Sequence, residues 1–146
     1  MIEEERLPGG GLQTEKMPGH WVLARLGKKV LRPGGVELTN AMLTALPVGP
    51  GARVVEFAPG LGYTAQLTLA RYPTSYTAVE PDEDAAGLVR KYLRGNGQRC
   101  VVGRAESTGL PDGSATVVYG EAMLSMQTEL RKRQIIAEAY RVLAPG

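Results

Sequence analysis

The stretch VVEFAPGLG, residues Val54–Gly62, decides the fold. It begins as a short β-branched run, which is typical of a buried strand, and it ends in a glycine-containing turn. Residues 63–71 then show a helical pattern. A strand that leads through such a turn into a helix is the unit of a parallel α/β sheet, in which ligands bind at the turn. Gly60 and Gly62 allow the backbone to approach a ligand and to present N–H groups to it.

Short strands and helices alternate on both sides of this unit. The sequence predicts strands at 53–57, 76–79, 99–102 and 116–119, and helices at 20–30, 37–46, 63–71, 82–94 and 126–143. This alternation indicates βαβ units with right-handed crossovers. We therefore expect an α/β fold: a Rossmann-like, doubly wound parallel sheet with about four strands, preceded by N-terminal helices.

Composition and glycine and proline placement divide the chain into three parts. Residues 1–19 are polar and rich in glycine and proline, which predicts a flexible arm. Residues 20–50 form an N-terminal helical segment and a candidate lid. Residues 51–146 form the N-terminal part of a cofactor-binding domain.

Charge and residue counts exclude several classes of protein. The chain has 146 residues and a net charge of +2, which gives no case for a dedicated nucleic-acid binder. Its one cysteine, Cys100, and its one histidine, His20, exclude an internal disulfide framework and a cysteine-cluster or histidine-based metal site. No apolar run approaches the roughly 20 residues of a membrane span. We expect a cytoplasmic protein with no metal and no membrane partner.

Glu80 closes the second predicted strand, where a carboxylate can accept two hydrogen bonds from a ribose diol. Taken alone, the glycine pair has a simpler interpretation as a tight turn. Taken alone, Glu80 has a simpler interpretation as an acid that stabilises the N-terminus of the next helix. Together they predict an adenosine-containing ligand. Residues 60–65 also fit the Gly-x-Gly-x-x-Ala pattern of dinucleotide enzymes, which leaves a nicotinamide or flavin oxidoreductase as an alternative. Glu56 argues against it, because a carboxylate repels a pyrophosphate and attracts an ammonium or sulfonium cation.

Four ordered motifs resemble those of the class I S-adenosylmethionine-dependent methyltransferases. Residues 56–62 resemble the first motif, acid-x-Gly-x-Gly-x-Gly, with Ala58 in place of the first glycine. Residues 77–82 resemble the second motif, in which the acid holds the ribose. Residues 103–118 are similar to the stretch Gly-Asp-Ala-x-x-Leu-Pro, turn, strand, and residues 141–146 to the end of the next helix. The subgroup that the chain resembles most is the small-molecule type 11 methyltransferases.

The resemblance implies a methyltransferase that binds S-adenosylmethionine and methylates an unidentified small-molecule acceptor. Within it, Glu56 and the 58–62 loop hold the methionine end and Glu80 the ribose. The family has an aspartate that contacts the adenine at the position of Arg104. Because arginine cannot accept that hydrogen bond, residues 105 and 106 are expected to contact the adenine instead. The implied cofactor-binding set is Glu56, Ala58, Pro59, Gly60, Gly62, Glu80, Pro81, Ala105 and Glu106.

Two residues are candidates for the catalytic base. Glu121 lies just past the fourth predicted strand, where the family meets the methionine amine and the acceptor; a solvated loop acid is the simpler interpretation. His20 could deprotonate an acceptor from a lid-like helix; a surface or interface histidine is the simpler interpretation.

The family continues beyond the Pro-Gly that ends this sequence, into a fifth strand and a closing hairpin. We therefore expect a truncated domain whose fourth strand is an open edge, with Val117, Val118 and Tyr119 facing solvent or a partner. An open apolar edge predicts a homodimer. It also keeps a third hypothesis open, a catalytically inactive scaffold or dimerisation module. Basic clusters lie on helix faces without interleaved aromatics, so nucleic acid is not an expected partner.

Overall fold

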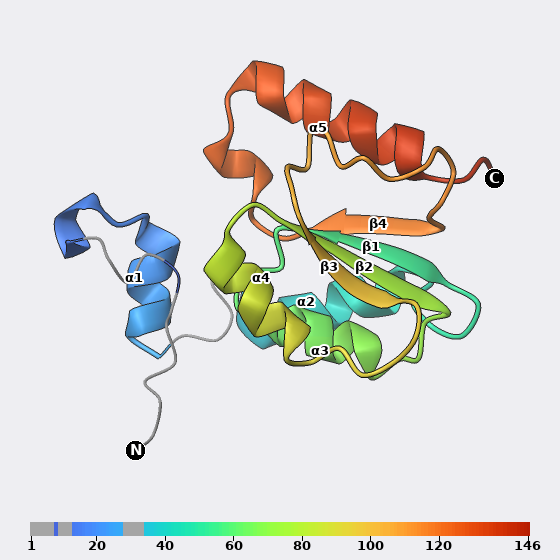
Figure 1. Cartoon of the computed structure of the whole chain (residues 1–146), viewed down its shortest axis with the longest axis horizontal. Coiled ribbons are helices and arrows are strands. Elements are labelled where there is room, and N and C mark those ends of the chain that lie inside the picture. The colour runs from blue at the N-terminus through green and yellow to red at the C-terminus, as the bar shows by residue number, and fades with distance from the viewer. Residues whose placement is uncertain (1–7, 9–12, 28–33) are drawn as a thin grey trace.

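A parallel four-stranded sheet forms the centre of the computed structural model, which describes residue 8 and residues 13–27 and 34–146 (Figure 1). The sheet has the order β3-β2-β1-β4. Its strands are β1 (Arg53–Phe57), β2 (Ser75–Glu80), β3 (Gln98–Val102) and β4 (Val117–Gly120). The structure thus confirms all four predicted strands and the Rossmann-like α/β fold.

The described residues form five α-helices: α1 (Gly19–Arg25), α2 (Gly35–Ala45), α3 (Tyr63–Leu69), α4 (Glu83–Arg90) and α5 (Glu129–Val142). Local capping makes some of these helices shorter than the apolar pattern predicted. α5 begins later than expected because the Thr128 side chain accepts a hydrogen bond from the Arg131 N–H and caps the helix. α1 ends earlier, before Gly27, whose φ of +82° is left-handed. Residues 28–30 of the predicted first helix lie outside the described residues.

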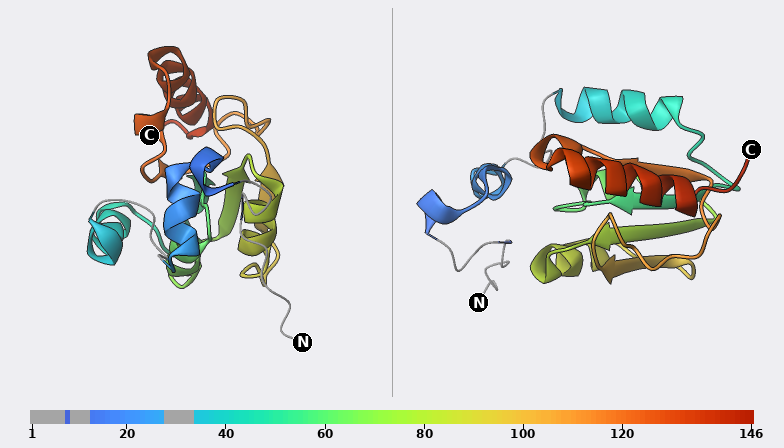
Figure 2. Two further views of the ribbon diagram at one scale, coloured as in Figure 1. Left: turned by 90° about the vertical axis from the view of Figure 1, so that its left-hand side faces the viewer. Right: turned by 90° about the horizontal axis from the view of Figure 1, so that it is seen from above.

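Helices cover both faces of the sheet, so the sheet is doubly wound. α2, α3 and α4 lie on one face and α5 lies on the other (Figures 1 and 2). One core cluster fills the first face and includes Leu43, Val54, Tyr76 and Val89. A second core cluster lies between the sheet and α5 and includes Val55, Phe57, Ile135 and Val142. The central strand β1 is buried along residues 54–57 because both faces of the sheet are covered there, whereas the edge strand β3 is only partly buried.

The strand order reverses between β1 and β4. From β1 the chain adds β2 and then β3 on one side, and it returns to place β4 on the other side of β1. A crevice forms where the order reverses, at the carboxyl ends of the strands, and ligands of open α/β sheets bind there. α1 lies beyond these carboxyl ends (Figure 1).

The expectation that residues 117–119 face solvent or a partner is wrong for two of the three residues. Val117 is 3% exposed and Tyr119 is 6% exposed, whereas Val118 is half-buried. An edge strand exposes one row of backbone groups, not its faces, and the helices cover both faces of β4. In the described part of the chain β4 pairs with β1 alone.

Residues 13–18, which precede α1, belong to the described part of the chain. Residues 14–16 form a 3₁₀ turn, and Met17 is buried against Trp21, so the predicted arm does not extend to residue 19. Residues 1–7 and 9–12 lie outside the described residues. None of the described helices is long and apolar enough to cross a membrane.

Candidate functional site

A cavity of about 240 Å³ opens at the carboxyl ends of β1, β2 and β4. Its walls come from the turn after β1 with the start of α3, from the end of β2, from the segment after β4 and from α1. The described lining residues are His20, Trp21, Glu56, Ala58, Pro59, Gly60, Leu61, Tyr63, Thr64, Glu80, Pro81, Glu121, Ala122, Met123, Met126 and Gln127. They include no lysine or arginine and three carboxylates. The reversal point of the strand order thus holds a polar, acid-rich site.

The turn after β1 has a left-handed backbone at Ala58, Gly60 and Gly62, with φ of 52°, 59° and 81°. At Gly60 an added Cβ would meet no heavy atom within 4 Å, so this side of the turn is open. At Gly62 an added Cβ would lie 3.0 Å from the ring of Tyr92. Gly60 therefore leaves room for a ligand, whereas Gly62 lets α4 pack against the turn and does not line the cavity.

Glu80 ends β2 and ties this strand to the glycine turn. Its Oε2 accepts a hydrogen bond from the Gly60 N–H at 3.1 Å, and its Oε1 accepts one from the Asp82 N–H at 3.0 Å. Burial raises the pKa of Glu80 to about 7; the two N–H groups oppose this, and the charge of Asp82 adds to it. A carboxylate offers about four acceptor positions, so two remain for hydroxyl groups of a ligand.

Glu56 is the most deeply buried acid of the cavity, at 2% exposed. The Tyr76 hydroxyl donates to its Oε2 at 2.5 Å, and Tyr119, its register partner on β4, also hydrogen-bonds to it. Burial raises the pKa of Glu56 to about 7, the two hydroxyls oppose this, and the charges of Glu121 and Glu80 add to it. A cation in the cavity would favour the ionised form of this carboxyl.

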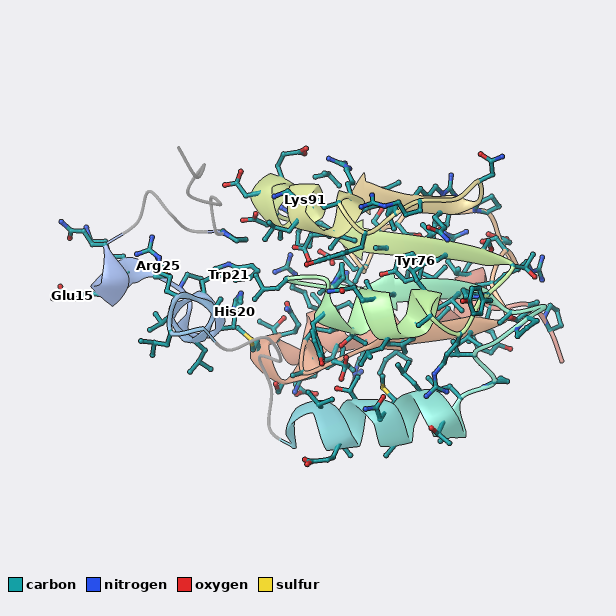
Figure 3. The ribbon with its side chains drawn as sticks, turned by 90° about the horizontal axis from the view of Figure 1, so that it is seen from below. Glu15, His20, Trp21, Arg25, Tyr76 and Lys91 are labelled. Carbon is teal, nitrogen blue, oxygen red and sulfur yellow. The ribbon has the colours of Figure 1, made fainter. Side chains whose placement is uncertain are left out.

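The hydroxyl partners extend away from the cavity into the core. Thr68 Oγ1 of α3 lies 2.6 Å from the Tyr119 hydroxyl. Figure 3 shows Tyr76 in the body of the sheet, remote from α1. The network therefore anchors Glu56 to β2, β4 and α3 at once.

Glu121 follows β4 and lines the cavity as predicted. Its Oε2 accepts a hydrogen bond from Thr39 of α2 at 2.9 Å, and Thr39 is fully buried. Its charge also raises the pKa of Glu56, which lines the same cavity. The carboxylate is thus held by a buried hydroxyl, unlike a freely solvated loop acid.

α1 places His20 and Trp21 at the cavity. Figure 3 shows both residues together on this helix, at one end of the molecule. Trp21 packs with Met17, Ala24 and Ala85, so it belongs to a small core as well as to the cavity wall. The His20 ring lies 4.4 Å from the Trp21 ring.

The Nδ1 atom of His20 is buried and has no hydrogen-bond partner in the described part of the chain. Burial lowers the pKa of His20 below its usual 6.5, and the charge of Asp82 opposes this. At neutral pH the imidazole is therefore uncharged, which is the form that can accept a proton.

Three residues of the predicted cofactor-binding set do not line the cavity: Gly62, Ala105 and Glu106. Ala105 is buried in the core beneath α5. Glu106 forms an ion pair with Arg131, Nη2 to Oε1 at 2.9 Å, and lies 3.9 Å from Arg104. The other predicted residues come together in the cavity.

Sequence reasoning missed Tyr63 and Thr64 in the wall of the cavity and the hydroxyl groups behind its carboxylates. Tyr63 and Thr64 directly follow the motif and could have been found from their position next to it. Tyr76, Tyr119 and Thr39 reach Glu56 and Glu121 from other elements, and no local sequence signal marks such partners.

The cavity offers what S-adenosylmethionine requires. The open side of Gly60 admits a ligand close to the backbone, and the free acceptor positions of Glu80 suit a ribose diol. The acidic lining suits a ligand with ammonium and sulfonium groups. The residues present therefore fit this cofactor.

Comparisons with known proteins identify the family of the chain. A family model described as a methyltransferase domain matches residues 55–146, which is more than half of the chain. The chain belongs to this family of methyltransferase domains, and its resemblance to the class I S-adenosylmethionine-dependent methyltransferases is confirmed. The comparisons thus favour the methyltransferase interpretation over the dinucleotide one.

A Haemophilus influenzae protein described as uncharacterized is 36% identical over 132 residues, which are 88% of this chain and 53% of the relative. An S-adenosylmethionine-dependent methyltransferase from Mesorhizobium loti shares the fold, with a TM-score of 0.64 and 18% identity over 73% of this chain and 49% of that one. A chain from a complex that contains the Haloferax volcanii Trm112 methyltransferase activator aligns with a TM-score of 0.65 and 20% identity, over 73% of this chain and 47% of that one. The chain spans about half the length of the curated relative that it matches.

Proposed function

We propose that the chain is the cofactor-binding part of an S-adenosylmethionine-dependent methyltransferase with a small-molecule acceptor. The proposal rests above all on one observation: the buried Glu80 carboxylate accepts a hydrogen bond from the Gly60 N–H in the glycine turn. This pair joins the two motifs that bind the ribose and the methionine end of the cofactor in the family. Membership in the methyltransferase domain family supports it.

The residues of the chain have separate parts in the proposed reaction. Bound S-adenosylmethionine supplies a methyl group on a sulfonium, whose thioether is a good leaving group. Glu80 accepts hydrogen bonds from the ribose, and the turn at Gly60 lies against the methionine end. In the proposal Glu56 attracts the positive charge of that end. Trp21 and the methionines after β4 exclude water, so that the acceptor and the methyl group meet in line.

Two groups are proposed to take the acceptor proton. His20 lines the cavity with its uncharged imidazole, whose buried Nδ1 has no hydrogen-bond partner among the described residues, and Glu121 lines the same cavity. Ala105 and Glu106 are proposed to meet the adenine at the margin of the cavity. In this arrangement Glu106 would do so while paired with Arg131.

Calorimetric titration with S-adenosylmethionine and S-adenosylhomocysteine tests the proposal. We expect micromolar binding by the chain and a loss of roughly ten- to a hundredfold in Glu80→Ala, because a hydrogen bond to a charged group contributes about 1.5–3 kcal/mol. Glu83→Ala is the matched control, since Glu83 is an exposed acid at the start of α4. Glu80→Gln keeps an acceptor oxygen and should retain part of the affinity.

The outcomes distinguish the three hypotheses. A folded chain that binds neither ligand refutes cofactor binding and favours the scaffold or dimerisation module. Binding of a nicotinamide dinucleotide in place of S-adenosylmethionine restores the oxidoreductase alternative. Equal affinity in Glu80→Ala and in the wild type removes the ribose role of Glu80.

We also propose a homodimer that forms through the free edge of β4, because the outer row of backbone groups on this strand has no strand partner in the described part of the chain. Sedimentation equilibrium should then give twice the monomer mass, and a monomer at micromolar concentration refutes the dimer. The proposed location is the cytoplasm, since Cys100 is a free, buried cysteine that suits a reducing compartment.

A further inference from the structure

A buried threonine of α2 holds an acidic side chain of the cavity from a distant part of the sequence. Thr39 Oγ1 lies 2.9 Å from Glu121 Oε2, although the two residues are 82 positions apart. A threonine in a helix ordinarily bonds the carbonyl four residues earlier. Here that carbonyl, Gly35 O, is the longer contact, at 3.3 Å. The single hydroxyl hydrogen therefore has its shorter contact with the carboxylate.

Glu121 and Glu56 lie at the carboxyl ends of two adjacent strands. In the β1–β4 register, Glu56 pairs with Tyr119, so Glu121 follows its partner by two residues. Both side chains line the same cavity. Each is held by a hydroxyl from another element: Tyr76 holds Glu56, and Thr39 holds Glu121. The result is a fixed pair of carboxylates at one place in the site.

We propose that Thr39 is a positioning residue: it holds Glu121 beside Glu56, and this carboxylate pair gives the site a preference for S-adenosylmethionine over S-adenosylhomocysteine. The inference rests on the proposed function, because it concerns the same cavity and cofactor. Thr39 touches neither ligand and acts through Glu121.

The preference follows from charge. S-adenosylmethionine carries a sulfonium where S-adenosylhomocysteine carries a neutral thioether, so the cofactor has one more positive charge than the product. Two fixed carboxylates in a partly buried site attract that charge, and attraction falls with distance and with exposure to water. A Glu121 side chain released from Thr39 samples positions nearer to solvent, where its attraction for the cofactor is weaker. S-adenosylhomocysteine keeps the ammonium of the methionine end and lacks the sulfonium, so its binding loses only the attraction for the ammonium.

The test measures the ratio of the two dissociation constants by calorimetry. In Thr39→Val, which keeps the shape and removes the hydroxyl, we expect the preference for S-adenosylmethionine to fall by about three- to tenfold. Thr39→Ser should restore it, and Glu121→Gln should lower it at least as far. Thr39→Val in the Glu121→Gln background should have no further effect, because the two residues act as one unit.

A matched control is Thr44→Val, which removes a hydroxyl from the exposed end of the same helix, where it accepts a hydrogen bond from Arg71. The preference should stay at its wild-type value in that variant. Thr39→Ala is a second hydroxyl-free variant, and it gives the same reading if the valine side chain distorts α2.

Specific results overturn the inference. The inference is wrong if the preference is unchanged in both Thr39→Val and Thr39→Ala. It is also wrong if these variants lose affinity for both ligands equally, because that result indicates a purely structural role. An effect of Thr39→Val that persists in the Glu121→Gln background also overturns the inference. A wild-type chain that binds neither ligand refutes the proposed function itself, and the inference with it; binding of both ligands with no effect of Thr39 refutes the inference alone.

Discussion

Ala58 is the residue at which the chain departs from the first family motif, and the structure gives this departure a physical consequence. Its φ of +52° is left-handed, a conformation that costs an L-residue with a Cβ about 1–2 kcal/mol. Glycine adopts it freely but loses more entropy on folding. Ala58→Gly should therefore raise the free energy of unfolding by up to about 1 kcal/mol in urea titrations.

The control for this prediction is an alanine in an ordinary helix. Ala41 is exposed on α2, and Ala41→Gly should lose about 1 kcal/mol. Destabilisation of both variants by the same amount would show that the left-handed backbone of residue 58 carries no strain.

Tyr76 provides a second test at the scale of single residues. Tyr76→Phe keeps the buried ring and removes the hydroxyl that donates to Glu56 at 2.5 Å. Because that hydrogen bond lowers the pKa of Glu56, its loss should raise this pKa further. The free energy of unfolding at pH 7 should fall by about 1–3 kcal/mol, the usual cost of leaving a buried polar group without its partner.

Urea unfolding measures this loss, and Tyr140→Phe is the control because Tyr140 is 82% exposed on α5. The control should stay within about 0.5 kcal/mol of the wild type. A Tyr76→Phe variant as stable as the control would mean that the carboxyl finds another donor.

The residue scale also shows what the sequence could predict of the site. Glu56 and Glu80 could be found because each ends a strand inside a recognisable motif, and parallel strands end at the same edge. Thr39 and Tyr76 could not, because a hydroxyl that bonds to a carboxylate on another element depends on the packing of the whole sheet. The predicted adenine contact of Glu106 stays a prediction; its observed partner is Arg131.

At the scale of elements, α1 depends on a small hydrophobic cluster centred on Trp21. It has seven residues, and helices this short are marginal in water without packing. Its Trp21 is 7% exposed and packs against Ala85 of α4 and Leu61 of the glycine turn. The docking of α1 should thus be separable from the folding of the sheet.

Trp21→Ala tests this separation by hydrogen exchange. A large-to-small change at a buried tryptophan costs about 3–5 kcal/mol, more than so short a helix can sustain. Amide protection should therefore disappear in α1 and persist in β1 and β2. Leu23→Ala on the same helix is the control, since Leu23 is 39% exposed, and it should preserve the protection. Retained protection of α1 in Trp21→Ala, or its loss together with that of β1, would contradict independent docking.

The alternation of apolar runs and helical patterns predicted the strands well, because the covered faces of the sheet leave at least a short apolar run in each strand. The ends of helices were less predictable. The first turn of α5 depends on the Thr128 cap, and the apolar pattern continues through it. The error about Val117 and Tyr119 had a different cause: an open edge was equated with exposed side chains, although burial depends on the faces.

On the scale of the whole molecule, the cavity lies where three strands end and two carboxyls are buried together. Glu56 and Glu80 have pKa values of about 7 in the folded chain and 4.5 when exposed, chiefly because burial disfavours their charged forms. A raised folded pKa gives stability that is fully present below pH 4.5 and is lost as the pH rises through 7. Burial of the two carboxyls therefore lowers the stability of the ligand-free fold at neutral pH, and the same two carboxyls can hold a cation when they are ionised.

The free energy of unfolding of the ligand-free chain should accordingly fall between pH 5 and pH 7, by up to about 1.4 kcal/mol per pH unit for each of the two carboxyls. Glu56→Gln should remove about half of that slope in urea titrations at several pH values. Glu138→Gln is the control: hydrogen bonds from Arg141 lower the pKa of Glu138 to about 2, so its contribution is lost only as the pH falls below 4.5. An equal slope in Glu56→Gln and in the wild type would mean that Glu56 is already ionised in the empty site. Addition of S-adenosylmethionine should flatten the wild-type slope, because a bound cation favours the ionised carboxyls and so returns their folded pKa values toward 4.5.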